Sequence, residues 1–144
     1  MKIKEENIVK DASDGIAKDY GIYYLKDKKG KEWIRIKIYR HDFCLSLFDM
    51  PGEYTWEECK KLAEDIGYTL PSKKEWDIID AYRDEIDKIL EDYEGDELKG
   101  CYWSVSQYIS TTAWLYYANA GSVYDDFEYL TYHGRSLAYT SQLL

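Results

Sequence analysis

Apolar and polar residues alternate over residues 33–39, where isoleucine at every second position is followed by Arg35 or Lys37. This period of two is typical of a half-buried β-strand. An earlier apolar run, 21–25, is joined to it by Lys-Asp-Lys-Lys-Gly, so the two runs predict an N-terminal β-hairpin. A third short run, 43–48, stops at Asp-Met-Pro-Gly and predicts one more strand followed by a turn.

Two helices are predicted by their capping residues. A hydroxyl residue is followed three positions later by glutamate at Thr55 and again at Ser72. In such a capping box the hydroxyl accepts from the N3 amide and the glutamate reaches back to the cap amide. The first helix is expected over about 55–66 and the second, a long one, over about 72–93. Their buried faces are predicted to carry Trp56, Cys59, Leu62, Ala63 and Ile66, and then Trp76, Ile79, Tyr82, Ile86, Leu90 and Tyr93.

After Gly100 the pattern changes to β-branched and aromatic residues interrupted by turn residues. Four stretches, 101–105, 113–118, 122–124 and 134–140, predict strands, and Asn-Ala-Gly between the second and third predicts a hairpin turn. Strands, helices and strands follow one another without alternating βαβ units. The predicted fold class is therefore α+β, with an N-terminal β-hairpin, two helices and a C-terminal antiparallel sheet.

The length of 144 residues fits a single domain, 1–144. Its parts are predicted to be a β-hairpin and strand in 1–50, two helices in 51–100, and a β-rich ligand-binding half in 101–144. Basic residues become rare at the boundary near residue 100, because Arg135 is the only Lys or Arg after Lys99. No Pro, Gly or Ser linker marks that boundary, so we expect two halves of one unit.

The net charge of −9 and the pI of about 4.7 argue against nucleic acid as a partner, since phosphate binding needs clustered bases. No apolar run approaches the roughly 20 residues that cross a bilayer, and membrane insertion is not expected. The first residues lack the apolar stretch of a secretory signal. We therefore expect a cytoplasmic location for the chain as written, and a surface or phage-associated one if a leader was trimmed or another export route exists.

The three cysteines, Cys44, Cys59 and Cys101, form no CxxC pair. Reduced, buried thiols are the favoured interpretation, because free cysteine is usually buried. A disulfide between two of them stays open, since sequence spacing does not decide it.

Several short motifs occur in a familiar order. They are residues 54–59, Ala63, residues 67–76 (Gly-Tyr-Thr-Leu-Pro-Ser-Lys-Lys-Glu-Trp), residues 102–106 (Tyr-Trp-Ser-Val-Ser) and Ala113-Trp114. Together they resemble the W-E-x-A, G-x-R-L-P-[ST]-x-x-E, Y-W-S-S-[ST] and A-W motifs of bacterial C-type-lectin-like proteins, including the DUF1566-type domains of gut Bacteroidetes. The variable proteins of diversity-generating retroelements and the formylglycine-generating enzymes share that fold. The resemblance covers roughly residues 54–139 and implies a C-type-lectin-like fold.

The chain departs from the family pattern at Thr69, where Arg is usual, and at Val105, where Ser is usual. It also lacks the Glu-Pro-Asn, Gln-Pro-Asp and Trp-Asn-Asp motifs with which sugar-binding relatives hold calcium, so calcium-dependent sugar binding is not implied. The family tryptophans are expected to form scaffold, because large aromatic residues dominate cores. These are Trp56, Trp76, Trp103 and Trp114.

Catalysis is not predicted. Cys101 and His133 could form a thiol–base pair, but no local signature supports them, and His133 and His41 are expected to lie on solvated turns. The carboxylate runs 84–87 and 91–97 lack the ligand order of an EF-hand and are interpreted as the solvent-exposed face and the C-terminal end of the second helix. Neither a metal nor a cofactor is predicted.

The last 44 residues contain eight of the 16 tyrosines beside Ser, Thr, Asn and Gly, and no lysine. This mixture is typical of antibody-like contact surfaces. We therefore predict a non-catalytic recognition module that binds a protein or cell-surface ligand. The alternatives are a structural, self-associating domain forming a homo-oligomer and, least favoured, a cysteine-dependent enzyme. The candidate contacts, expected on loops or outer faces, are Tyr108, Ser110, Thr111, Thr112, Asn119, Tyr124, Asp125, Asp126, Tyr129, Tyr132 and His133.

Overall fold

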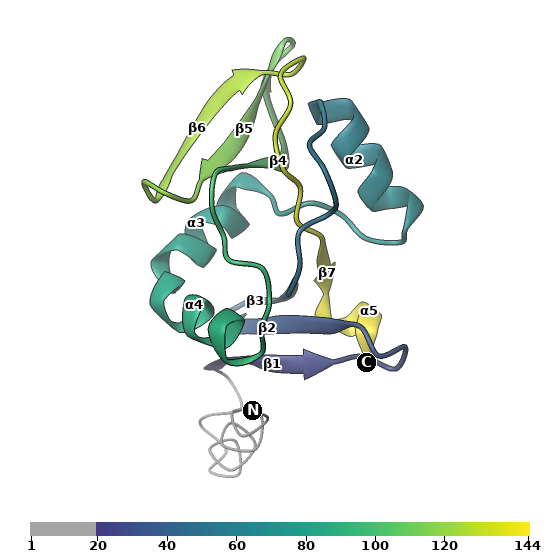
Figure 1. Ribbon diagram of the computed structural model, residues 1–144, viewed down its shortest axis with the longest axis vertical. Coiled ribbons are helices and arrows are strands. Elements are labelled where there is room, and N and C mark those ends of the chain that lie inside the picture. The colour runs from purple at the N-terminus through teal and green to yellow at the C-terminus, as the bar shows by residue number, and fades with distance from the viewer. Residues whose placement is uncertain (1–19) are drawn as a thin grey trace.

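The computed structural model describes residues 20–144, which form an α+β fold with two antiparallel sheets and four helices (Figure 1). The four-stranded sheet has the order β1-β2-β3-β7 and contains β1 (Tyr20–Lys26), β2 (Glu32–Ile38), β3 (His41–Ser46) and β7 (Leu137–Tyr139). The three-stranded sheet contains β4 (Cys101–Ile109), β5 (Thr112–Tyr117) and β6 (Ser122–Phe127) in that order. The helices are α2 (Trp56–Asp65), α3 (Lys73–Ala81), α4 (Arg83–Asp92) and α5 (Thr140–Leu143).

The predicted N-terminal hairpin is confirmed, and Asp27 explains its turn. The Asp27 Oδ1 atom accepts hydrogen bonds from the amides of Lys29 and Lys31, both at 2.9 Å. Its Oδ2 atom accepts from the indole of Trp33 at 3.0 Å. Gly30 has a φ of +85°, a conformation in which a side chain would be strained. One aspartate and one glycine therefore close the turn between β1 and β2.

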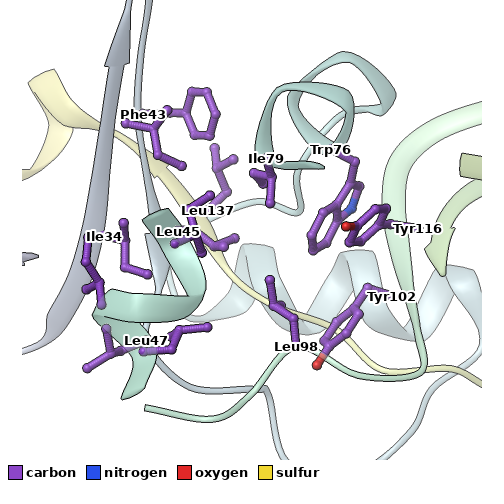
Figure 2. Packing of buried hydrophobic residues seen from close by; sticks show 14 of the residues in the cluster. Ile34, Phe43, Leu45, Leu47, Trp76, Ile79, Leu98, Tyr102, Tyr116 and Leu137 are labelled. Atoms are coloured by element: carbon purple, nitrogen blue, oxygen red, sulfur yellow. The ribbon is translucent and has the colours of Figure 1, made fainter. Parts of the chain in front are cut away.

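The main core lies between the four-stranded sheet and helices α3 and α4 (Figure 2). Ile34, Phe43 and Leu45 of the sheet are buried there with Trp76 and Ile79 of α3. Fully burying a side chain of this size stabilises the fold by about 1.5–3 kcal/mol. A second buried cluster, which includes Trp56, Cys59, Trp103 and Leu115, packs α2 against the three-stranded sheet.

The long helix expected over 72–93 is wrong, because the chain breaks at Tyr82 into α3 and α4. Tyr82 has a φ of −113° and a ψ of 30°, outside the helical region. The next residue, Arg83, donates to the carbonyls of Leu98 at 2.9 Å and Ala118 at 3.0 Å. These tertiary bonds hold the chain at the break. Apolar residues continue at three- and four-residue steps on both sides of Tyr82, so the sequence pattern does not reveal the break.

The last predicted strand pairs with the N-terminal sheet, so placing it with the other C-terminal strands is wrong. In β7, Leu137 lies opposite Leu45 and Tyr139 opposite Phe43 of β3. The C-terminal sheet therefore has three strands, of which β4 and β6 extend beyond their predicted ends to Ile109 and Phe127. The chain's last segment ties the two sheets into one structure.

Arg135 is fully buried where three segments meet. Its Nε atom lies 3.2 Å from Asp49 Oδ1, and its Nη1 atom donates to the carbonyl of Asp96 at 3.1 Å. A further bond runs from Nη2 to the carbonyl of Leu47 at 3.4 Å. This side chain links the exit of β3, the loop after α4 and the approach to β7.

All three cysteines are free. Cys44 and Cys59 are buried as expected, and burial raises the pKa of their thiols to about 11 and about 12. Cys101 is only partly buried. Every helix within residues 20–144 is too short or too polar to span a bilayer.

Candidate functional site

The base of the three-stranded sheet is clamped between two helices. On one face Trp103 and Leu115 pack with Trp56 of α2, and on the other Tyr116 stacks on Trp76 of α3 at 4.7 Å between ring centroids. Trp56 and Trp76 also donate their indole N–H groups to the carbonyls of Ser104 and Trp103, at 2.8 and 3.3 Å. The scaffold role predicted for these tryptophans is confirmed for Trp56, Trp76 and Trp103, whereas Trp114 is only half-buried.

Beyond the helices the sheet ends in a set of exposed side chains, which we call the tip surface. Its apolar members are exposed by 56% at Tyr108, 52% at Ile109, 48% at Phe127 and 71% at Tyr129. Phe127 stacks on Tyr129 at 5.5 Å, and Tyr108 contacts Trp114 at 4.8 Å. The tip surface consists of Tyr108, Ile109, Ser110, Thr111, Phe127 and Tyr129.

Polar bonds hold the tip surface in place. Gln107 Nε2 donates to Glu128 Oε2 at 2.9 Å, and the Glu128 amide donates to the carbonyl of Thr111 at 3.0 Å. The carbonyl of Glu128 accepts from the amide of Trp56, the first residue of α2, at 3.1 Å. Because its backbone is bonded on both sides, the tip presents its apolar groups on a pre-ordered framework, which lowers the entropy cost of binding.

A second group of candidate contacts lies on the α2 face of the sheet. Tyr132 donates to Asp126 Oδ2 at 2.6 Å and packs edge-on against Trp103 at 5.1 Å. The Tyr124 hydroxyl lies 3.5 Å from Cys101 Sγ. Burial raises the pKa of both tyrosines, and their bonds to Asp126 and Cys101 raise it further. Both hydroxyls therefore stay neutral, and Tyr132 acts as a fixed donor.

Asn119 and His133 lie at the other end of the sheet. Asn119 Oδ1 accepts from the amide of Gly100 at 3.0 Å, and His133 Nε2 lies 3.8 Å from Glu53 Oε2. β5 separates this end from the tip by its six residues, about 20 Å of extended chain. The structure therefore does not bring all predicted contacts onto one surface.

Most of the predicted contacts are at least partly accessible, with one exception. Thr112 is only 6% exposed, so its expected position on a loop is wrong. It is the first residue of β5, the central strand, and is paired with Ile109 on one side and Phe127 on the other. The exposed candidates are Tyr108, Ser110, Thr111, Asn119, Tyr124 and Tyr129, and the half-buried ones are Asp125, Asp126, Tyr132 and His133.

Two apolar residues of the tip, Ile109 and Phe127, were absent from the predicted contacts, although about half of each side chain is exposed. Both lie just past the strand ends expected at Val105 and Tyr124. Phe127 lies on the same face of β6 as Val123 and Asp125. The run Val-Tyr-Asp-Asp-Phe has no alternation of apolar and polar residues that would have shown how far the strand extends.

The thiol–base pair that an enzyme would need is not formed. Among described residues, Cys101 Sγ is bonded to Tyr124, and His133 reaches Cys101 only through a backbone bond of 3.0 Å. The His133 ring lies instead 5.5 Å from Tyr102 and beside Gly100. No group of three or more His, Cys, Asp or Glu side chains within residues 20–144 is placed to hold a metal ion.

A scan against protein-family models finds no match for this chain, and a search of curated proteins finds none either.

Proposed function

We propose that this chain is a non-catalytic recognition module, of the C-type-lectin-like kind that its motifs resemble, and that it binds a protein or cell-surface ligand through the tip surface. The observation that carries the proposal is the grouping of Tyr108, Ile109, Phe127 and Tyr129, each about half exposed or more. Contiguous exposed apolar groups on a monomer mark interaction sites, and tyrosine binds with few rotors to freeze.

The framework beneath the tip supports the same function. Buried tryptophans fix the base of the sheet on two helices, and the backbone of Glu128 is bonded to Thr111 and Trp56. Tyr132 adjoins the tip on the α2 side through its bond to Asp126, and Tyr124 lies farther along the same face, beside Cys101. Since Tyr132 already bonds Asp126 and packs on Trp103, we assign it a supporting role beside the exposed Tyr129.

The test is a selection in which displayed peptides, displayed protein fragments and arrayed glycans are offered to the purified chain. Ligands that enrich are then measured against a tip variant, Ile109→Ser with Phe127→Ser and Tyr129→Ser. Tyr20→Ser with Tyr39→Ser is the matched control, because these two exposed tyrosines contact each other at 5.4 Å on the four-stranded sheet, far from the tip. We expect binding to survive in the control and to be lost in the tip variant.

Self-association is the second candidate function, because an exposed apolar tip also suits a second copy. Light scattering over a range of concentrations separates the two. A wild-type chain that stays monomeric while binding a selected ligand supports recognition. Oligomers that dissociate in the tip variant would support self-association instead.

Membership of a retroelement-diversified set is a further part of the proposal, and it rests on the order of the motifs. The neighbouring DNA tests it. A reverse transcriptase gene beside a near-copy of the segment that encodes the tip would support it, and a locus with neither would favour a single fixed ligand.

A further inference from the structure

The outer edge of β6 is open. In the part of the chain that the structure describes, the three-stranded sheet ends at β6, with β5 on its other side (Figure 1). The register pairs Ala113 with Asp126 and Leu115 with Tyr124, and the Glu128 amide bonds the Thr111 carbonyl in the same register. Since antiparallel residues bond their partner at every second position, Tyr124 and Asp126 face β5. The amide and carbonyl groups of the residues between them therefore point outward.

The chain closes both ends of this edge. At one end the Phe127 amide donates to Asp126 Oδ1 at 2.8 Å and its carbonyl accepts from Leu130 at 3.1 Å. At the other, Gly121 lies so close to α3 that an added Cβ would be 3.0 Å from Asp80 Oδ1. The open part is thus short and centred on the backbone of Val123 and Asp125.

On one face of β6 the side chains along the open edge are apolar, acidic and apolar in turn. Val123, Asp125 and Phe127 lie on the same face, with the carboxylate between Val123, which is partly buried against the main core, and the half-exposed Phe127. No hydrogen bond or ion pair within residues 20–144 engages the Asp125 carboxylate, whereas Asp126 is bonded to Tyr132 and Phe127. The only base after Lys99 is the buried Arg135. On the face of Asp125, Lys73 of α3 lies 4.9 Å from the ring of Trp114, the cross-strand neighbour of Asp125, but it pairs with Asp77 at 3.6 Å.

We propose that β6 accepts an extended segment of another protein as a fourth strand, and that this segment has the pattern apolar–x–Lys/Arg–x–apolar. Addition to a sheet edge gains affinity from main-chain hydrogen bonds and specificity from alternate side chains. A base directly opposite Asp125 lies about 5 Å away between Cβ atoms, with apolar residues two positions on either side opposite Val123 and Phe127. This inference goes beyond the proposed function, because it needs the open edge of β6 and, of the tip surface, only Phe127.

A second copy of this chain fits the same edge poorly when Asp125 lies opposite Asp125. Two β6 strands paired antiparallel about their centres would bring the Asp125 carboxylates together, and like charges opposite each other destabilise a sheet. The added strand must therefore supply a base that β6 lacks. The alternative role of Asp125 is to prevent β6 from pairing with any other strand.

The test titrates the isotope-labelled chain with the acetylated, amidated peptide Thr-Val-Thr-Lys-Thr-Val-Thr at up to millimolar concentration. We expect the largest NMR shifts, and new protection from hydrogen exchange, at the amides of Val123 and Asp125. Val123→Pro removes an outward N–H and leaves the β5 ladder intact, so it should weaken binding at least tenfold in a folded chain. Retained affinity in folded Val123→Pro would overturn the proposal.

A charge exchange keeps the test independent of folding defects. Asp125→Lys should reject the lysine peptide and bind the version with glutamate in its place, with affinities reversed at least tenfold from the wild type. Equal affinity of both peptides for both proteins would overturn the proposal, as would the absence of shifts along β6 at millimolar peptide. A variant that keeps Phe127, Ile109→Ser with Tyr129→Ser, should bind the lysine peptide as tightly as the wild type.

Discussion

At the scale of single residues, buried charges decide how the segments of this fold meet. Burial raises the pKa of Asp49 and lowers that of Arg135, and each charge partly offsets the effect on the other. Such a pair tolerates replacement by neutral groups better than the loss of one partner. Arg135 is also the one Lys or Arg in the last 44 residues. It is fully buried, so it stabilises the fold and does not lie on a binding surface.

Replacing Arg135 alone should therefore be costly. Arg135→Met leaves Asp49 half-buried without its partner and the carbonyl of Asp96 without a donor. We expect a loss of about 3–5 kcal/mol in the free energy of unfolding, measured in urea. The double variant Asp49→Asn with Arg135→Met should recover part of that loss. A double variant no more stable than the single one would contradict the role of the unpaired charge.

Acid should weaken the pair between Asp42 and Arg35. Burial acts to raise the pKa of Asp42, but hydrogen bonds from Arg35, at 2.9 and 3.0 Å, and from Thr140 lower it overall. A carboxyl group whose pKa is lower in the folded state contributes stability above its unfolded value, about 3.9, and loses it as pH falls through the folded value. Urea unfolding between pH 6 and 2 should show a smaller acid-induced loss in Asp42→Asn. Identical pH profiles would contradict this.

At the scale of elements, local signals explain where helices begin but not where they break. Both predicted capping boxes are formed, with Thr55 and Ser72 accepting from the amides of Glu58 and Glu75. The break at Tyr82 depends on carbonyls at Leu98 and Ala118, which lie 15 and 35 residues from Arg83 along the chain. The apolar periodicity of residues 72–93 cannot predict contacts with residues so far away along the chain.

The contacts of Arg83 should therefore stabilise the fold more than an exposed base of α4 does. Arg83→Ala removes donors to Leu98, Ala118 and the Tyr116 hydroxyl. We expect a loss of about 1–3 kcal/mol, because carbonyls left without partners cost that much. Lys88→Ala is the control, since the Lys88 side chain is 67% exposed and pairs with Asp92 at 3.5 Å. Equal effects of the two changes in urea unfolding would argue against this account of the break.

Strand partners were also beyond sequence reasoning, and this affects the candidate site. The composition of residues 134–140 predicts a strand but does not show its neighbour, which is β3 and not one of the other C-terminal strands. In the same way Thr112 was expected on a loop or outer face, one residue before the strand predicted at 113–118, yet its place in the central strand buries it. Tyr108, Ser110, Thr111 and Tyr129 were found from composition, and Ile109 and Phe127 emerged only when the sheet was assembled.

At the scale of the whole molecule, the described part of the chain is one unit, because β7 joins the end of the chain to the N-terminal sheet. We expect a single unfolding transition, with tryptophan fluorescence and far-ultraviolet circular dichroism coincident in urea. Ala138→Pro, in the middle of β7, should shift that transition for both signals together, since proline removes a ladder bond. Separate transitions for the two signals would show that the sheets fold independently.

The central claim is that the tip surface carries ligand binding, and the most direct measurement is the affinity of one selected ligand for three forms of the chain. The account predicts that the Tyr20→Ser, Tyr39→Ser control binds like the wild type. Ile109→Ser with Phe127→Ser should bind at least 30-fold more weakly, since each central apolar contact contributes about 1–2 kcal/mol or more. Unchanged affinity in a folded Ile109→Ser, Phe127→Ser variant, or an equal loss in the control, would contradict it.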